Sequence, residues 1–490
     1  MDDPWNVTRR DALRTAAAGA STVGSGWTAI AGATGVEAAS TDDDCEPTPL
    51  PEVASMARAI GEGEPLTVLD LAALDNNIDR VVKEVERRDW SVRPALKSFR
   101  SPEFAAYVLS RLPEPRGMMF HLRPVPELLE VLPENPDLML GYVPTVGELE
   151  AYFAEDGTDE PPHRLRLTLD APELIRACAD LASGGNRELP VEVALEFDSG
   201  MQRGGIKNEA ELSRAIEILR ENRDVLRLTA TLCYDGHATV KGNEQFRQAV
   251  ADDAQRRYEA FLEQLREEAG DFVDVDSLVR NGPGSSNYQN WDPDGPATEV
   301  SPGTAFVYHG YLQGRGFDNE GLKRTLVHGA PAMRIPADGP RTPLVGVEPP
   351  WEETGQVGDT VPEEGDPGRP ALEGYEEVLI KGGAWPSNEG DLAEMVYPEG
   401  MEDDPSSGGR GNNTSAVLAP KGALELGDYV LLRPQISGDG VDYFGAVHAI
   451  RDGELQGVWP TRTRWQRPRT KTPDRGPPDD VGPDESPPER

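Results

Sequence analysis

The sequence predicts a (β/α)₈ barrel followed by an all-β domain. Between residues 66 and 300, short β-branched runs alternate with amphipathic helical stretches, as in a barrel of parallel strands covered by helices. Beyond residue 300, strand-like segments follow one another without helices, which is typical of an all-β domain. The alternative, an open doubly wound sheet, would show fewer strand–helix units and a phosphate loop after its first strand.

Eight runs are the expected barrel strands, and amphipathic stretches such as Asp75–Val85 and Glu244–Ala269 are the expected helices. The runs are Thr67–Leu71, Ser91–Leu96, Met118–Leu122, Leu138–Tyr142, Leu165–Leu169, Val191–Phe197, Leu226–Cys233 and Ser277–Val279. The strands expected in the second domain are Ala305–Tyr308, Leu326–Ile335, Glu377–Ile380, Tyr429–Arg433, Gly445–Arg451 and Gln456–Trp459.

The expected barrel covers residues 66–300 and the expected β domain residues 301–465, with residues 41–65 forming a linker and a first segment of the β domain. Within the β domain, the Pro/Gly/Glu-rich stretch 336–374 is expected to be a disordered insertion. The Pro/Asp/Arg-rich residues 466–490 are expected to form a disordered tail.

The N-terminal residues 1–40 resemble a twin-arginine export signal. The pair Arg9-Arg10 precedes a weakly apolar run of Ala and Gly, and a small-residue cleavage site follows near Ala38–Ser40. This order favours export of the folded protein to the cell surface or medium. If the segment is instead an exposed N-terminus that happens to contain two arginines, the protein is cytoplasmic.

The charge balance is strongly acidic. With 87 Asp and Glu against 48 Lys and Arg, the formal net charge is -39, and only eight of the basic residues are lysines. An acidic surface that uses Arg and avoids Lys is typical of halophilic proteins. The same charge repels nucleic acid and anionic lipid, so neither is an expected partner. Three scattered cysteines exclude a disulfide framework and a cysteine-rich zinc site.

Polar and glycine-rich segments follow four of the expected barrel strands at their carboxyl ends, where barrel enzymes carry their chemistry. They contain Lys97, Arg203, the segment Tyr234–Thr239 with His237, and the loop Asn281–Asn287. A lysine shielded by the barrel mouth can lose its proton and form a Schiff base with an aldehyde. The loop offers backbone N–H groups and hydroxyls to a phosphate from Gly282, Gly284, Ser285 and Ser286.

The remaining two side chains suit a pyridine ring. His237 could stack on such a ring, and Arg203 could face its nitrogen or phenolic oxygen. Taken singly, Lys97 could be a solvated surface residue and His237 an ordinary core histidine. Together at one end of the barrel, they predict a site for pyridoxal 5′-phosphate (PLP), with Lys97 as the cofactor lysine and Lys97 and His237 as catalytic residues.

The same segments resemble fold-type III PLP enzymes. Arg93–Glu103 resembles the cofactor-lysine segment of D-threonine aldolases and D-serine dehydratases, and Asp198–Gly205 resembles a motif they share with alanine racemases. Tyr234–Thr239 is similar to their strand-seven motif, which implies cofactor contacts from Tyr234 and His237. Residues 427–460 resemble the β domain of the aldolases and dehydratases. The resemblance also implies a homodimer, with the partner's β domain closing each site.

Two features depart from this family: its metal-binding residues are replaced, and the histidines that flank its lysine are Ala95 and Phe99 here. After the Arg433-Pro434 turn, the family carries metal-binding histidine and cysteine or aspartate residues, and this chain carries Gln435 and Ser437. An amide and a hydroxyl are poor ligands for a divalent ion, so we expect no metal site of this kind. His309 and His448 are candidate substitutes for the missing histidine, and the acidic residues Asp439 and Asp442 could supply replacement ligands.

Three functions remain open at this point. The first is a lyase resembling D-threonine aldolase that acts on a D-amino acid with a β-hydroxyl group. The second is an amino-acid racemase of the alanine type, because racemisation does not need the metal that assists aldol cleavage. The third is a PLP-binding protein that has lost turnover.

Overall fold

The computed structural model describes residues 46–122, 126–133, 136–154, 164–185, 190–239, 243–310, 312, 321–335, 374–383, 394–403, 414–435 and 438–461. The expected signal peptide 1–40, nearly all of the expected insertion 336–374 and the expected tail 466–490 lie outside the described residues.

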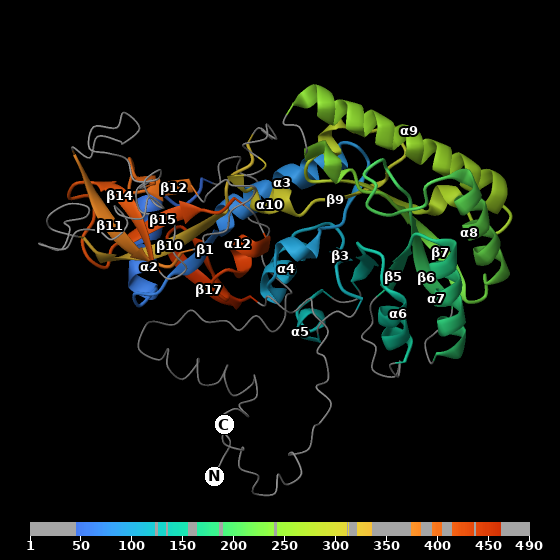
Figure 1. Ribbon diagram of the computed structural model, residues 1–490, viewed down its shortest axis with the longest axis horizontal. Helices are drawn as coiled ribbons and strands as arrows, with labels where there is room; N and C mark the ends of the chain where they lie inside the picture. The colour runs from blue at the N-terminus through green and yellow to red at the C-terminus, as the bar shows by residue number, and fades with distance from the viewer. Residues whose placement is uncertain are drawn as a thin grey trace, which may run out of the picture. The chain divides into compact units, whose positions relative to one another are not determined.

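One sheet is a nearly closed barrel of eight parallel strands, which confirms the predicted (β/α)₈ fold (Figure 1). The strands are paired in the order β2-β9-β8-β7-β6-β5-β4-β3, and an isolated parallel bridge between Ala95 and Met118 joins the two ends of this order. The strands are β2 (Ser91–Val92), β3 (Arg116–Met119), β4 (Asp137–Leu140), β5 (Arg164–Leu169), β6 (Val191–Glu196), β7 (Leu226–Leu232), β8 (Val279–Gly284) and β9 (Glu299–Ser301).

The first expected barrel strand is a strand of the other sheet. The run predicted at Thr67–Leu71 forms β1 (Leu66–Asp70), which pairs with strands of the β domain on both sides. All five of its residues are buried, and a continuous apolar run looks the same in a barrel as in the centre of another sheet. The eighth barrel strand is the three-residue β9, whose sequence Glu-Val-Ser carries no strand pattern. Lys97 therefore follows the first barrel strand, not the second.

Two further strand predictions need correction. Ala305–Tyr308 was expected to be a strand, and it belongs to the short helix α10 (Thr304–Val307) and the residue after it. The Ser285 hydroxyl accepts the backbone N–H groups of Gly303 and Ala305, which stabilises the first turn of α10. Ser277–Val279 spans the end of a 3₁₀ turn and the first residue of β8. Apolar runs of three or four residues do not distinguish strand from helix.

The barrel helices begin at residues that satisfy their first N–H groups. Asn208 and Asn243 accept from backbone N–H groups of α8 and α9, and Pro102 and Pro172 occupy the first positions of α4 and α7. Their apolar faces pack on the strands in one large core. The helices are α3 (Leu71–Glu86), α4 (Pro102–Leu109), α5 (Pro126–Leu129), α6 (Val146–Phe153), α7 (Pro172–Gly184), α8 (Glu209–Glu221) and α9 (Glu244–Ala269).

The β domain is a nine-stranded, mostly antiparallel sheet with the order β13-β14-β11-β10-β1-β16-β17, in which β15 pairs with β10 and β12. Helix α2 (Leu50–Ile60) packs its buried face against this sheet. Its strands besides β1 are β10 (Leu326–Arg334), β11 (Tyr375–Lys381), β12 (Glu394–Tyr397), β13 (Glu402–Asp403), β14 (Thr414–Pro420), β15 (Tyr429–Arg433), β16 (Ala446–Arg451) and β17 (Glu454–Pro460).

The β domain contacts the barrel near α4 and at the segment that carries Lys97. Trp459 on β17 packs against Phe104 on α4, with ring centroids 5.9 Å apart. The short helix α12 (Gly438–Asp442) contacts the 3₁₀ turn η1 (Leu96–Ser98). A Cβ atom added at Gly438 would come within 3.1 Å of the Lys97 carbonyl oxygen. The β domain of this chain therefore reaches its own cofactor-lysine segment.

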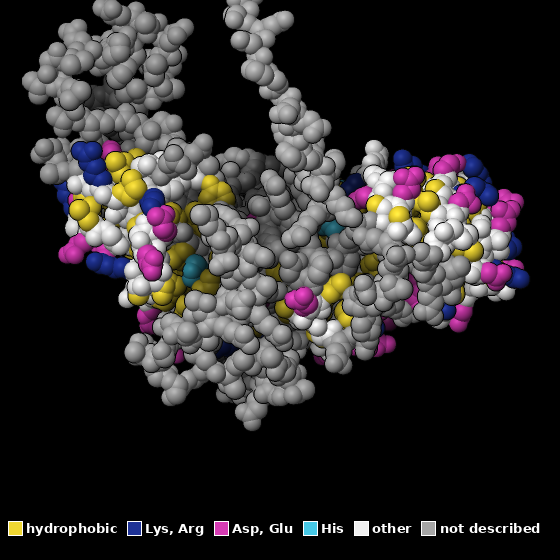
Figure 2. Space-filling model, turned by 90° about the horizontal axis from the view of Figure 1, so that it is seen from below, with side chains coloured by type: hydrophobic (Ala, Val, Ile, Leu, Met, Phe, Trp, Pro, Cys, Tyr) yellow, Lys and Arg dark blue, Asp and Glu magenta, His cyan; other side chains and the backbone are white. Residues whose placement is uncertain are grey.

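Several exposed basic side chains form ion pairs with acidic neighbours. Figure 2 shows Asp and Glu interspersed with Lys and Arg over the helical side of the barrel, at the right of the view. Arg214 pairs with Glu173 and Arg220 with Asp271, each at 3.0 Å. None of the described helices is long and apolar enough to span a membrane.

A network of buried ion pairs fills part of the barrel interior. The Arg93 side chain, directly after β2, is fully buried and donates to Glu299 Oε1 at 2.6 Å. It also donates to the Asp137 carbonyl oxygen at 2.6 Å. The charges of Arg93 and Arg116 lower the pKa of Glu299, although burial alone would raise it. Asp137 in turn pairs with Arg166 on β5. Arg93 thus connects β2, β9 and β4 across the seam where β2 and β3 share no regular ladder.

We predict that Arg93→Met lowers the free energy of unfolding by about 3–5 kcal/mol, because the fully buried Glu299 loses its nearest counter-charge and keeps only Arg116. Chemical denaturation followed by circular dichroism measures this change. Arg214→Gln, which removes an exposed ion pair on α8, serves as the control and should leave the unfolding midpoint in place. Equal stability of Arg93→Met and the wild type would contradict a structural role for the network.

Candidate active site

A cavity of about 520 Å³ lies at the carboxyl ends of the barrel strands. Residues that follow β2, β3, β7, β8 and β9 line it, together with Gly438 of α12. In a parallel barrel all strands end at one mouth, so segments far apart in sequence meet there. The volume falls within the range of small-molecule and cofactor sites.

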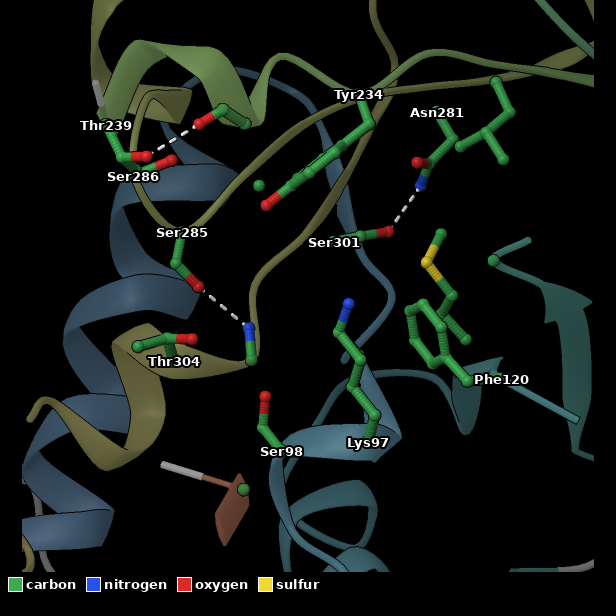
Figure 3. Close-up of a pocket in the computed structure, with 18 of the residues that line it drawn as sticks. Lys97, Ser98, Phe120, Tyr234, Thr239, Asn281, Ser285, Ser286, Ser301 and Thr304 are labelled. Carbon is green, nitrogen blue, oxygen red and sulfur yellow. Dashed lines mark hydrogen bonds between the residues drawn. The ribbon is translucent and has the colours of Figure 1, made fainter. Parts of the chain in front are cut away.

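Lys97 points into this cavity from η1, towards Tyr234 and Ser301 and between Ser285 and Phe120 (Figure 3). Its Nζ lies 4.1 Å from the centroid of the Phe120 ring, which follows β3. Part of the Lys97 surface is accessible to solvent through the cavity mouth. Protein atoms nevertheless surround its amine on most sides. Burial, together with the positive charge of Arg203, lowers the pKa of Lys97 to about 8. The deprotonated, nucleophilic amine is therefore more accessible near neutral pH than in an ordinary lysine.

The end of β8, with Gly282 and Gly284, and the turn after it, with Ser285 and Ser286, bring small residues and hydroxyls to another wall. Ser285 Oγ accepts from the N–H groups of Gly303 (2.9 Å) and Ala305 (3.0 Å), which uses its lone pairs and leaves its own hydrogen to donate. A Cβ atom at Gly284 would lie 2.9 Å from the Tyr234 ring, so only glycine fits there. Gly282 and Ser286 also line the cavity. A narrow cradle with hydroxyl donors suits a phosphate group.

Arg203 and Tyr234 form a stacked pair at another wall. The Arg203 guanidinium lies 4.8 Å from the Tyr234 ring centroid, and its Nη2 lies 3.6 Å from Glu196 Oε1 at the end of β6. Burial raises the pKa of Glu196 to about 7, against the lowering effect of Arg203. The loop that carries Arg203 turns back sharply at Gly205, which has φ +90° and no room for a Cβ atom against Phe197 and Asp198.

His237 stands apart from the other predicted residues. It lies on the 3₁₀ turn Gly236–Thr239, and it is not among the residues that line the cavity. Its Nδ1 is buried and has no hydrogen-bond partner among the described residues. The neighbouring Asp235 is fully buried and accepts from Asn287 Nδ2 (2.7 Å) and Trp291 Nε1 (2.9 Å). The structure thus brings together seven predicted site residues, namely Lys97, Arg203, Tyr234, Gly282, Gly284, Ser285 and Ser286.

Several residues that line the cavity were not predicted from the sequence, among them Phe120, Arg100, Ser301 and Gly438. Phe120 and Ser301 stand at carboxyl ends of strands, a position that could have identified them. Asn281 Nδ2 donates to Ser301 Oγ at 2.8 Å and so fixes that hydroxyl at the cavity wall (Figure 3). Gly438 comes from the other domain, and no local signal connects it with the barrel mouth.

Gln435 stands where the resemblance implies a metal-binding histidine, and its side chain is an amide. The Gln435 side chain lies against Gly310, so closely that a Cβ atom there would overlap its amide. Ser437 lies outside the described residues, as does the Asp439 side chain. Asp442 lies 3.5 Å from Arg100. Within the described parts of the chain, no three His, Cys, Asp or Glu side chains are grouped so as to hold a metal ion.

Solved structures of PLP enzymes share this architecture. D-threonine aldolase from Filomicrobium marinum matches with a TM-score of 0.61 at 17% identity, over 81% of this chain and 94% of the aldolase. D-threo-3-hydroxyaspartate dehydratase from Delftia sp. HT23 matches with a TM-score of 0.58 at 16% identity, over 82% and 98% of the two chains. Alanine racemase from Bacillus anthracis matches with a TM-score of 0.54 at 16% identity, over 80% and 97%. At these identities the matches show the fold alone. No curated protein sequence matches the chain significantly.

A barrel followed by a β domain, with a lysine after the first barrel strand, is the architecture of the fold-type III PLP family. Residues 69–309 match the family described as alanine racemase, N-terminal domain. Over this region the chain belongs to that family, as the resemblance in its motifs predicted.

We predict that the Lys97 amine in cofactor-free protein titrates near pH 8 and that Arg203→Gln raises this midpoint, because the variant removes a neighbouring positive charge. The rate of acylation of Lys97 can be measured across pH by mass spectrometry of the modified peptide. An unchanged midpoint in Arg203→Gln would show that Arg203 does not influence the amine.

Proposed function

We propose that the protein binds PLP through Lys97 and acts as a lyase on D-amino acids that carry a β-hydroxyl group. The observation that carries the proposal is the cavity itself. A lysine with a lowered pKa projects into it, opposite a glycine-rich wall with hydroxyl donors. Among the described lining residues none is Asp or Glu, which suits an anionic cofactor. D-threonine aldolase has the highest TM-score of the three solved enzymes compared above.

The residues present fit the cofactor. The Lys97 amine is the group that would bond to its carbonyl carbon, and Gly282–Ser286 would hold the phosphate with backbone N–H groups and hydroxyls. Arg203 and Tyr234 would contact the ring. When bound, PLP withdraws electrons from the substrate Cα and so weakens the bonds to that carbon.

The chain's own residues would then move the protons. Lys97 could accept or return a proton at Cα, because burial and the charge of Arg203 lower its pKa to about 8. Tyr234 and Phe120 flank the amine on two sides, with the Phe120 ring centroid 4.1 Å from Lys97 Nζ (Figure 3). Cleavage between Cα and Cβ also requires loss of the β-hydroxyl proton. His309 lines the cavity, and burial lowers its pKa to about 3, so its imidazole is neutral and can accept a hydrogen bond from that hydroxyl.

An amino-acid racemase is the second candidate, and Gln435 favours it. An amide at this place offers a divalent ion neither charge nor imidazole nitrogen. Racemisation needs proton transfer at Cα only, which Lys97 can provide on one face. A protein that binds PLP without turnover is the third candidate. Incubation with D-threonine, D-serine and D-alanine separates the three candidates by their products. A lyase releases an aldehyde and glycine from D-threonine or a keto acid from D-serine, and a racemase forms L-alanine from D-alanine. A protein without turnover releases no product.

Two further proposals concern the location of the enzyme and its assembly. We propose export by the twin-arginine route, since that route carries proteins with the cofactor already bound. We also propose a homodimer in which the partner's β domain helps to close each cavity. The small amino acid is its only proposed ligand besides PLP. Both proposals can be checked by fractionation of the source cells and by light scattering.

We predict that the double variant Ser285→Ala/Ser286→Ala weakens PLP binding by a few kcal/mol, at about 1–3 per lost charge-assisted bond. Fluorescence titration of the cofactor-free protein with PLP measures the change. Pyridoxal, which lacks the phosphate, is the control ligand and should bind the variant and the wild type equally. Undiminished PLP affinity in the double variant would place the phosphate elsewhere.

We predict that activity is insensitive to EDTA and is not stimulated by manganese or zinc, because Gln435 replaces an imidazole donor. Initial rates with D-threonine, measured before and after metal is added to EDTA-treated enzyme, decide the question. Strong saturable activation by manganese would mean that other ligands hold a metal. In that case Asp439 and Asp442 are the first residues to replace.

A further inference from the structure

A chain of hydrogen bonds leads from the buried ion pairs of the barrel to the cavity. Glu299 on β9 accepts from Arg93 Nε at 2.6 Å and from Asn281 Nδ2 at 2.9 Å. The same Asn281 nitrogen donates to Ser301 Oγ at 2.8 Å. Asn281 and Ser301 both line the cavity. Ser301 is therefore the cavity end of a chain that begins at the barrel seam.

This chain fixes the orientation of the Asn281 amide. Burial alone would raise the pKa of Glu299, but the charges of Arg93 and Arg116 lower it, so the carboxylate is ionised and can only accept. The amide must therefore turn its nitrogen towards Glu299, because the reverse orientation would set the amide oxygen against the carboxylate. Both hydrogens of this nitrogen are then used, one on Glu299 and one on Ser301.

The Ser301 hydroxyl consequently keeps its own hydrogen for another partner. A hydroxyl that accepts from an N–H group can still donate one hydrogen bond. Within the described parts of the chain, Ser301 Oγ makes no hydrogen bond besides the one from Asn281. Ser301 is only partly buried and lines the cavity. Its hydrogen can therefore be donated to a ligand there.

Ser301 stands on the wall to which Lys97 points (Figure 3). The Tyr234 hydroxyl lies elsewhere, over Gly236, where a Cβ atom would come within 2.9 Å of its oxygen. In PLP the aldehyde carbon and the ring nitrogen lie at opposite ends of the ring. A ring bonded to Lys97 therefore extends its nitrogen towards the wall that carries Ser301.

The cavity offers no carboxylate to a protonated ring nitrogen. None of its described lining residues is Asp or Glu. Glu299 does not line the cavity, and Arg93 and Arg116 already engage it. The positive charge of Arg203 disfavours a second positive charge on the ring and suits the anionic phenolic oxygen. These surroundings favour a neutral ring nitrogen that accepts a hydrogen bond.

We propose that Ser301 donates its hydroxyl hydrogen to the ring nitrogen of PLP and that this nitrogen is unprotonated. The proposal rests on the proposed use of PLP at Lys97. Asn281 is a positioning residue, because its N–H group occupies the Ser301 oxygen and so directs the hydroxyl hydrogen into the cavity. A neutral ring withdraws electrons from the substrate Cα less strongly than a pyridinium does, which favours return of the proton to Cα over its loss to the cofactor.

Solid-state NMR of the wild type loaded with PLP that carries ¹⁵N in its ring measures the protonation state directly. The ¹⁵N chemical shift of a neutral pyridine differs widely from that of a pyridinium, and free PLP at alkaline and at acidic pH supplies the two references. We expect the signal of the loaded protein near the neutral reference. A signal at the pyridinium reference would overturn the proposal.

PLP binding to the cofactor-free protein tests the donor. Ser301→Ala is expected to raise the apparent Kd of PLP by about threefold to tenfold, since one lost neutral hydrogen bond has an effect of this order. The PLP analogue with carbon in place of the ring nitrogen should bind Ser301→Ala and the wild type equally. Ser301→Thr keeps the hydroxyl and should keep the PLP affinity.

Ser183→Ala is the matched control, because it removes a hydroxyl on α7 that donates one hydrogen bond, to the Ala179 carbonyl oxygen at 2.8 Å. It should bind PLP as the wild type does, and circular dichroism confirms that each variant folds. Unchanged PLP affinity in Ser301→Ala, or equal weakening of PLP and its carbon analogue, would overturn the role of Ser301 and leave the proposed function standing. A wild type that binds no PLP contradicts both.

Discussion

The barrel depends on one guanidinium at its weakest point. The strand order ends at β2 and β3, which share only the bridge between Ala95 and Met118. Arg93 lies at this seam with its side chain fully buried and bonds to Glu299 on one side and to Asp137 on the other. A buried charge is tolerated only when it is paired and hydrogen-bonded. The bonds from Arg93 to Glu299 and Asp137 therefore hold the strands that carry these two residues in place beside β2.

The position of Lys97 follows from this closure. Lys97 comes four residues after Arg93, on a turn that the bridge at Ala95 ties to β3, and Phe120 at the end of β3 contacts its Nζ. On the other side, Gly438 allows α12 to lie against the Lys97 backbone. The amine is thus held between the barrel seam and the β domain. Enclosure by both lowers its pKa, which is the property that a lysine nucleophile requires.

Much of the site could be predicted from the sequence because it lies in short segments after strands. Lys97, Arg203, Tyr234 and the Gly282–Ser286 loop all reach one cavity, since parallel strands end at a common mouth. His237 shares a segment with Tyr234 but is not among the residues that line the cavity, and no pattern in the sequence shows which residues of a 3₁₀ turn face a cavity. Arg100 and Gly438 were missed because they line the cavity where α12 lies against the barrel, and no local pattern shows that contact. The misplacement of β1 has a similar cause, since a buried strand does not indicate which sheet it joins.

Identification of the lysine that bonds to PLP tests the account most directly. Native enzyme loaded with PLP is reduced with borohydride and digested, and the phosphopyridoxyl peptide is sequenced by mass spectrometry. The structure predicts that the modified peptide contains Lys97, because its amine projects into the cavity beside the phosphate-binding wall. Modification of another lysine, or of none, would contradict the assignment of the cavity as a cofactor site.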